Sequence, residues 1–190
     1  MTKRRLEAKA YRSREHLYLH ELEALLETAK NGKGKNAHRD YTLILIMVRH
    51  GLRAIEASRL NWEAINLIGG TIYVDRAKGS KPSTHRLQGD EIEALRKLKD
   101  SQPENTKEVF GLQPRGVCRA TERVAVKANL DISFHTHMLR HTCGYLLINN
   151  NHNSRKVQDY LGHKVFKMTE RYTAMATNAF DDIDWNNMKG

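Results

Sequence analysis

The sequence predicts a mostly helical α+β domain with a small antiparallel β-sheet. Several stretches carry apolar residues at helical spacing, as Leu22 and Leu26 do within residues 20–30, and this pattern is typical of a helix with one buried face. Residues 65–76 instead contain two short β-prone runs, INLI and TIYV, joined by two glycines. Because consecutive glycines accept the positive φ angles of a two-residue turn, this stretch predicts a β-hairpin.

The same periodicity predicts the other elements in order. Helices are expected at residues 20–30, 40–50, 53–60, 89–100, 115–129, 137–147 and 156–161, with a third strand at residues 83–87. Residues 43–48 form the longest apolar run, so their helix should lie at the centre of the core. Gly51 is expected to end that helix, and Gly162 the one near residue 161.

Composition restricts the class of protein. The 190 residues suffice for one domain with tails, and 32 Lys and Arg against 22 Asp and Glu give a net charge of +10. Such a balance favours a polyanionic partner, nucleic acid first and an anionic membrane second. Cys118 and Cys143 form no disulfide framework and are expected to be buried free thiols. No apolar run spans a membrane and no signal peptide opens the chain, so we expect a cytosolic protein.

Two basic features each have two interpretations. Residues 1–14 are either a solvated, partly disordered arm or an arm that follows DNA. On the helix expected at residues 115–129, three cations recur every four residues: Arg119, Arg123 and Lys127. This stripe could lie along a DNA backbone, or it could be a solvated helix face.

The densest chemical signal lies in two strings, HMLRH at residues 137–141 and LGHKVFKMTERY at residues 161–172. His137 and Arg140 are three residues apart, so a helix would place them on one face. The nine residues from His163 to Tyr172 allow a turn and a further helix to return both to one site. Arginine binds phosphate oxygens, histidine transfers protons near neutral pH and tyrosine can act as a covalent nucleophile. Together they suit a phosphodiester substrate.

These strings resemble the C-terminal signature of the tyrosine recombinases, the phage integrase family. Upstream, GLRAIEASRLNWEAI at residues 51–65 is similar to the first-arginine motif of that family, and RAKGSKPSTHRL at residues 76–87 resembles its lysine-bearing β-hairpin. Three blocks in the right order are a far more specific signal than HxxR alone. The short chain and the strings HMLRHTCGYLL and VQDYLGH are most similar to the fimbrial phase-switch invertases, which are single-domain recombinases.

The resemblance implies a catalytic set of two arginines, a lysine, two histidines and a tyrosine: Arg53, Lys78, His137, Arg140, His163 and Tyr172. In this family the arginines hold the scissile phosphate, the lysine protonates the leaving 5′ oxygen and the tyrosine forms a 3′-phosphotyrosyl link. The histidines assist the proton transfer of the tyrosine and hydrogen-bond the phosphate. Strand exchange through a Holliday junction follows, without metal, ATP or any other cofactor.

Three residue assignments keep alternatives. Lys78 occupies the family position in the K-G pair, and Lys81 is the second candidate for the acid, while both could simply contact DNA phosphates. Glu56 either orients Arg53, as the resemblance implies, or forms an ordinary surface ion pair. His141 is expected to be a structural histidine satisfied by hydrogen bonds. The alternative is a zinc site among His135, His137 and His141, since histidines at i, i+4 can hold zinc. No Glu follows the first histidine of the i, i+4 pair, His137 and His141, and no third ligand stands at a familiar spacing.

The domain organisation and partners also follow from the resemblance. We expect a basic arm at residues 1–14, a catalytic domain at residues 15–180 and a tail at residues 181–190, with no N-terminal core-binding domain. The alternative is a fragment of a longer recombinase. The implied partners are double-stranded DNA with inverted-repeat sites, three further copies in a homotetramer joined through the C-terminal segment, and accessory DNA-bending proteins. The implied location is the bacterial cytoplasm, at the nucleoid and not at a membrane.

Three other classes of protein are alternatives, and each predicts a different activity. A type IB topoisomerase has a similar site but relaxes supercoils without joining two DNA sites. A regulatory DNA-binding protein with this fold would bind without cleaving, although the complete set of site residues argues against it. An RNA-binding or membrane-surface protein is supported by charge alone.

Overall fold

Helix α3 (Ala37–His50) is the central element of the fold. The computed structural model describes residues 14–150, 152–165 and 167–173, and residues 42–48 of α3 are buried without interruption. A helix that is apolar on all sides must be surrounded by other elements. Helices α2 (Leu19–Lys30), α5 (Gly89–Asp100), α6 (Pro114–Lys127) and α7 (His137–Asn149) all pack against α3. The central helix predicted from the apolar run is confirmed.

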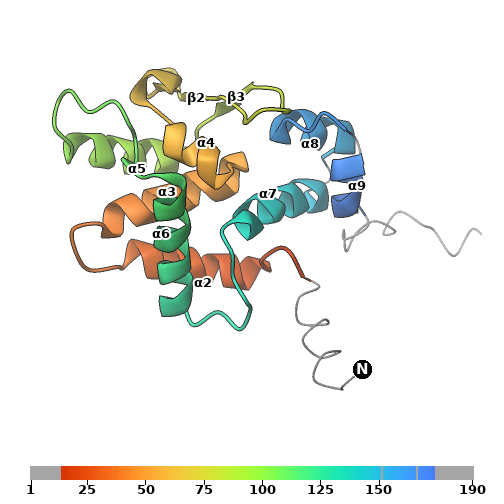
Figure 1. Cartoon of the computed structure of the whole chain (residues 1–190), viewed down its shortest axis with the longest axis horizontal. Coiled ribbons are helices and arrows are strands. Elements are labelled where there is room, and N and C mark those ends of the chain that lie inside the picture. The colour runs from red at the N-terminus through yellow and green to blue at the C-terminus, as the bar shows by residue number, and fades with distance from the viewer. Residues whose placement is uncertain (1–13, 151, 166, 174–190) are drawn as a thin grey trace, which may run out of the picture.

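The remaining elements lie around this core (Figure 1). They are α4 (Ala54–Arg59), the short 3-10 helix η1 (Trp62–Ala64), the strands β1 (Ile65–Asn66), β2 (Thr71–Val74) and β3 (Ser83–Arg86), and the helices α8 (Ser154–Leu161) and α9 (Lys167–Thr173). The three strands form one antiparallel sheet in the order β1-β2-β3. The mostly helical fold with a small antiparallel sheet is as predicted.

The turn of the first hairpin differs from the prediction. Asn66 pairs with Thr71, so four residues form the loop and not the two glycines alone. The Asn66 carboxamide oxygen accepts hydrogen bonds from the backbone N–H of Ile68 and Gly69, at 3.1 and 2.7 Å. An asparagine that bonds its own following backbone in this way stabilises a longer turn, and this local capping shortens β1.

Helices α7, α8 and α9 form a second, smaller apolar cluster beside the main core. Its buried members are Cys143, Ile148, Val157, Leu161 and Tyr172, and Figure 1 shows these helices grouped at one end of the molecule. Gly144 permits the close approach of α9 to α7, because a Cβ at this position would lie 2.6 Å from the Tyr172 ring. The free thiol of Cys143 is buried, as expected, whereas that of Cys118 is partly exposed.

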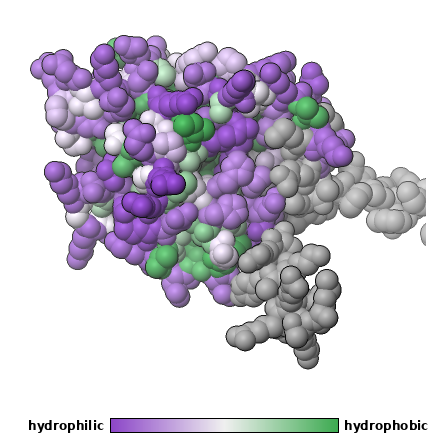
Figure 2. Space-filling model, in the orientation of Figure 1, coloured by the Kyte–Doolittle hydropathy of each residue, from purple (hydrophilic) through white to green (hydrophobic). Residues whose placement is uncertain are grey.

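The visible surface is mostly hydrophilic, with small scattered apolar areas (Figure 2). None of the helices in the described ranges is long and apolar enough to cross a bilayer. Residues 1–13 of the expected basic arm (1–14) and the whole expected tail at residues 181–190 lie outside the described residues.

Gly162 connects helix α8 to the loop between β2 and β3. It has a left-handed backbone with φ of 70°, and its carbonyl oxygen accepts a hydrogen bond from the Lys81 N–H at 3.1 Å. A Cβ at this position would lie 2.5 Å from the Lys81 carbonyl oxygen. The expected end of the helix is confirmed, and the close approach explains why glycine occupies it.

We predict that Gly162→Ala lowers the free energy of unfolding by more than the roughly 1–2 kcal/mol that a left-handed non-glycine residue costs. The added cost comes from the clash with Lys81. The control is Gly111→Ala, since Gly111 has a similar φ of 58° but open space around its Cβ position. Urea denaturation of both variants provides the comparison, and equal losses would contradict the predicted clash.

Candidate active site

Glu56 accepts hydrogen bonds from two different segments of the chain, at residue 53 and at residues 76–77. Its carboxylate accepts from the backbone N–H of Arg53 at 3.0 Å, from the Arg53 guanidinium at 2.6 Å, from Arg76 at 3.1 Å and from the N–H of Ala77 at 3.0 Å. The carboxylate is buried, and Arg140 lies 4.0 Å away. Glu56 therefore lies in an interior cluster with three cations and does not form the alternative, a simple surface pair.

This environment fixes the charge of Glu56. Burial alone would raise its pKa, but the backbone N–H groups of Arg53 and Ala77 and the charges of Arg76 and Arg140 lower the pKa to about 2. The side chain is thus ionised at all physiological pH values. It compensates guanidinium groups that would otherwise be buried without a counter-charge.

Arg140, on helix α7, is almost fully buried, with a relative exposure of 1%. It donates hydrogen bonds to the carbonyl oxygens of Gly51 at 2.5 Å and Leu161 at 2.7 Å. Burial, and then the charges of Arg53 and Arg76, lower its pKa to about 10. The guanidinium remains protonated at neutral pH and joins the ends of α3 and α8 beneath the site.

Arg76 is a buried site residue that the sequence interpretation missed, since it was treated only as the end of a strand. It donates to the carbonyl oxygens of His50 at 2.9 Å, Gly51 at 3.1 Å and Tyr160 at 2.7 Å, besides its contact with Glu56. Burial lowers its pKa. The available signal was the two-residue strand period: Ile72 and Val74 face the core, so residue 76 should face inward as well.

Aromatic rings pack between the sheet and helices α3 and α8. His85 on β3 stacks on Tyr160 of α8, with ring centroids 3.7 Å apart. Its Nδ1 lies 3.0 Å from Nδ1 of His50, and Nε2 of His50 lies 2.9 Å from the Glu91 carboxylate. Burial, and then the charges of His50 and Arg76, lower the pKa of His85 to about 3. A neutral His85 thus links the sheet to α3 and α8 at physiological pH.

The two candidate lysines lie in the loop between β2 and β3, and both are exposed. The loop itself is held close to the arginines, because the Ser80 hydroxyl accepts a hydrogen bond from Arg53 at 3.2 Å and its backbone pairs with His163. Lys78 and Lys81 lie on either side of this anchored segment. The geometry leaves the choice between Lys78 and Lys81 open.

The histidines and the tyrosine gather on helices α7 and α9 and the segment between α8 and α9. His163 is buried, and its Nδ1 lies 3.0 Å from the Thr169 hydroxyl. Its ring stacks on Tyr172 with centroids 6.3 Å apart. The Tyr172 hydroxyl lies 3.0 Å from Nδ1 of His141, whereas His137 is exposed and its ring contacts that of His141 at 4.6 Å.

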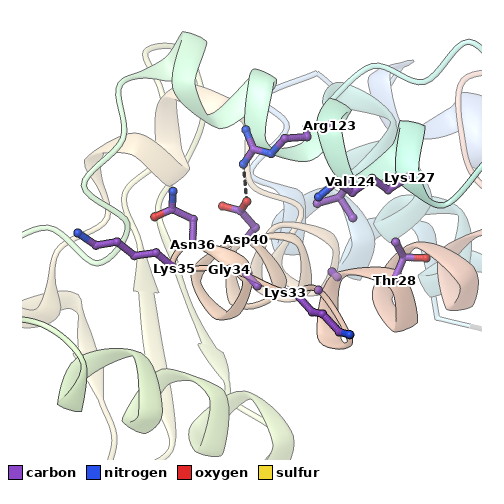
Figure 3. Close-up of a pocket in the computed structure, with 12 residues that line it drawn as sticks. Thr28, Lys33, Gly34, Lys35, Asn36, Asp40, Arg123, Val124 and Lys127 are labelled. Atoms are coloured by element: carbon purple, nitrogen blue, oxygen red, sulfur yellow. Dashed lines mark hydrogen bonds and ion pairs between the residues drawn. The ribbon is translucent and has the colours of Figure 1, made fainter.

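The cations of α6 lie outside this cluster. Arg119, Arg123 and Lys127 are exposed on one helix, as the spacing predicted. Figure 3 shows Arg123 paired with Asp40, at 2.5 Å, beside a hollow that Lys33, Lys35 and Lys127 also line. The arrangement is compatible with a DNA-contacting surface and with a solvated one. Across the described part of the chain, no group of three or more His, Cys, Asp or Glu side chains is placed to hold a metal.

Paired arginines on one carboxylate, a lysine-bearing loop and a tyrosine among histidines are groups that can bind a phosphodiester, protonate its leaving oxygen and attack its phosphorus. Comparison with known proteins agrees, because residues 15–179 match the model of the phage integrase family. The chain belongs to this family and is a site-specific tyrosine recombinase. The family and fold class predicted from the sequence are confirmed.

Individual relatives support this assignment. The chain is 34% identical over 180 residues to the type 1 fimbriae regulatory protein FimB of Escherichia coli K12, which covers 90% of this chain and 88% of FimB. It is 34% identical over 152 residues to FimE of the same strain, covering 74% and 77% of the two chains. The solved structure of XerH recombinase in a post-cleavage complex with difH is 27% identical, with a TM-score of 0.76 over 87% of this chain and 51% of XerH. The chain thus spans about half the length of XerH.

We predict that Glu56→Gln lowers the free energy of unfolding at neutral pH by about 3–5 kcal/mol, because it leaves buried guanidinium groups without their counter-charge. The folded pKa is about 2 against an ordinary value of 4.5. The stabilisation by the carboxylate is therefore fully present above pH 4.5 and is lost as the pH falls toward 2.

Urea denaturation at neutral pH and at steps below pH 4.5 measures the difference between wild type and Glu56→Gln. That difference should shrink with acidity. The matched control is Glu23→Gln, on the exposed face of α2, which should change stability little at any pH. A difference that stays constant below pH 4.5 would show that the charge of Glu56 is not the source of the stabilisation.

Proposed function

We propose that this recombinase exchanges strands between two double-stranded DNA sites with inverted repeats, and so inverts, integrates or excises the segment between or beside them. The observation that carries the proposal is the placement of Arg53 and Arg140 around one buried carboxylate, with Arg140 on α7, the helix that packs against the Tyr172-bearing α9. Similarity to FimB over most of both chains favours inversion of a short regulatory segment, such as a promoter switch.

In the proposed reaction, Arg53 and Arg140 bind the non-bridging oxygens of the scissile phosphate. Arg53 is 22% exposed and can reach the substrate while it stays paired with Glu56. Both guanidinium groups would stabilise the charge that develops on the phosphorus oxygens, which is the main electrostatic requirement of phosphoryl transfer. His163 would donate a hydrogen bond to the same phosphate, and Glu56 keeps the arginines oriented.

The Tyr172 oxygen attacks phosphorus and the bond from phosphorus to the 5′ oxygen breaks. The 5′ oxygen takes a proton from Lys78, which acts as the general acid, and the 3′ end remains joined to Tyr172. The family resemblance gives His137 the accompanying proton transfer from the tyrosine. A 5′ hydroxyl from the partner duplex then reverses the reaction, and a second round resolves the Holliday junction. The phosphotyrosyl link conserves the bond energy, so no ATP and no metal are required.

The proposed assembly is a homotetramer on two DNA sites, assisted by accessory DNA-bending proteins, at the bacterial nucleoid in the cytoplasm. We propose that the C-terminal segment joins neighbouring protomers, as the family resemblance implies. Arg119, Arg123, Lys127 and Lys81 would contact DNA phosphates outside the scissile position. Arg123 would exchange Asp40 for a phosphate when DNA binds.

We predict that wild type forms a covalent adduct with nicked suicide DNA substrates from its native genomic neighbourhood, in buffer with a metal chelator, and that Tyr172→Phe forms none. The phenylalanine keeps the ring packing but lacks the nucleophilic oxygen. Denaturing protein gels reveal the adduct, and Tyr41→Phe on α3 is the control that should retain it. Binding of these substrates by wild type without adduct formation would instead support a regulatory DNA-binding protein.

A second prediction separates Lys78 from Lys81. Lys78→Ala should slow adduct formation by about 10²-fold or more, which is the usual effect of removing a general acid. A substrate with sulfur in place of the bridging 5′ oxygen should restore the rate, because a thiolate leaves without being protonated. Lys81→Ala should weaken DNA binding without showing this rescue. The reverse pattern would assign the acid to Lys81.

A further inference from the structure

His141 connects the proposed nucleophile to a carboxylate. Its Nδ1 lies 3.0 Å from the Tyr172 hydroxyl, and its Nε2 lies 3.8 Å from a carboxylate oxygen of Glu15. The imidazole itself is buried. Glu15, His141 and Tyr172 thus form a line of carboxylate, imidazole and hydroxyl, the same sequence of groups that activates the nucleophile in serine hydrolases.

Two packing features hold this line in place. The segment with Glu15 is attached to α7, because the N–H of Leu17 donates to the Thr142 hydroxyl at 2.9 Å. On the other side, the Tyr172 ring fits against Gly144, where a Cβ would lie 2.6 Å from the ring. Helix α7 therefore positions both neighbours of His141. Neither contact depends on the loop that bears Lys78.

The position of the carboxylate favours one tautomer of the imidazole. At 3.8 Å the Glu15 oxygen is an ion-pair neighbour of Nε2 and not a hydrogen-bond partner, and its negative charge favours a proton on that nitrogen. Nδ1, which lies 3.0 Å from the Tyr172 hydroxyl, is then the nitrogen that accepts the phenolic proton. The other titratable or charged groups nearby are His137, whose ring edge contacts His141 at 4.6 Å, His163, whose ring stacks on Tyr172, and Arg140, whose charge interacts with Tyr172. The positive charge of Arg140 favours the phenolate form of Tyr172, whereas Glu15 favours the imidazolium form of His141.

We propose that His141 is the general base for Tyr172 and that Glu15 is its positioning residue; this rests on the proposed strand-exchange function. As the bond from oxygen to phosphorus forms, the phenolic proton moves to Nδ1 of His141. The bond from phosphorus to the 5′ oxygen breaks, and that oxygen takes its proton from the lysine. In rejoining, the imidazolium returns the proton to the departing tyrosine oxygen. This assignment replaces His137 in the proton transfer and places His137 beside the base.

If His141 is the general base, DNA binding must change the surroundings of Tyr172. Tyr172 is only 2% exposed, so the substrate must uncover the phenolic oxygen while His141 stays in contact with it. Alternatively, the hydrogen-bond contact between His141 and Tyr172 holds the tyrosine in an inactive position away from DNA. The two roles predict opposite effects of removing the imidazole, since loss of a base slows cleavage, whereas loss of a storage contact leaves it equal or makes it faster.

The test is the rate of adduct formation by the full chain on suicide DNA, measured across pH. His141→Gln should lower the rate by about 10²–10⁴-fold and abolish the decline on the acid side of the pH profile. The sulfur-bridged substrate should not restore it, because sulfur replaces the need for an acid and not for a base. His135→Gln, an exposed histidine just before α7, is the matched control and should retain the wild-type profile.

Glu15→Gln provides a second test that does not remove the buried ring. Loss of the carboxylate should destabilise the imidazolium and shift the acid-side decline to lower pH, an effect that a purely structural role would not produce. Wild-type rates in His141→Gln, or an unmoved acid side in Glu15→Gln, would overturn the proposal. A wild-type protein that forms no adduct would instead refute the strand-exchange function itself.

Discussion

The site depends on one buried carboxylate that neutralises several guanidinium groups. Glu56 contacts Arg53 and Arg76 directly and lies 4.0 Å from Arg140. Three cations this close would repel one another in a low-dielectric interior, and each would lose its hydration. The carboxylate and a set of backbone carbonyls make the cluster possible. The cluster in turn fixes the start of α4, the end of β2 and the first half of α7 relative to each other.

The same constraint explains the close approach of backbones around the site. Arg76 and Arg140 both donate to the carbonyl of Gly51, where α3 ends in a left-handed turn, and each also donates to a carbonyl near the end of α8. Carbonyl groups at helix C-termini carry partial negative charge, which suits cations. Two helix ends thus supply part of the counter-charge. This leaves Arg53, at the edge of the cluster, as the cation most open to a phosphate.

Much of the fold could be predicted from the sequence because helical period and glycine positions are local signals. The apolar run of α3, the start of α4 at Arg53 and the end of α8 at Gly162 were all predicted. The hairpin turn was not, because the Asn66 side chain caps a longer loop. Arg76 was missed because its contacts come from α3, α4 and α8, which are distant in sequence. The motifs assigned roles to residues one by one, and those roles stay predictions, whereas the mutual contacts of these residues required the folded structure.

The contact between His141 and Tyr172 shows why long-range geometry matters for the chemistry. A free tyrosine has a pKa near 10, so only about one molecule in a thousand is ionised at pH 7. For the tyrosine to act as a nucleophile, either a nearby cation must stabilise its phenolate form or a base in direct contact must accept its proton. Arg140 and His141 are adjacent on α7, yet one joins the arginine cluster and the other contacts the phenol, because the 100° rotation per residue points them to different neighbours. One helix can thereby hold the proposed phosphate-binding group and the proposed proton acceptor at a fixed separation.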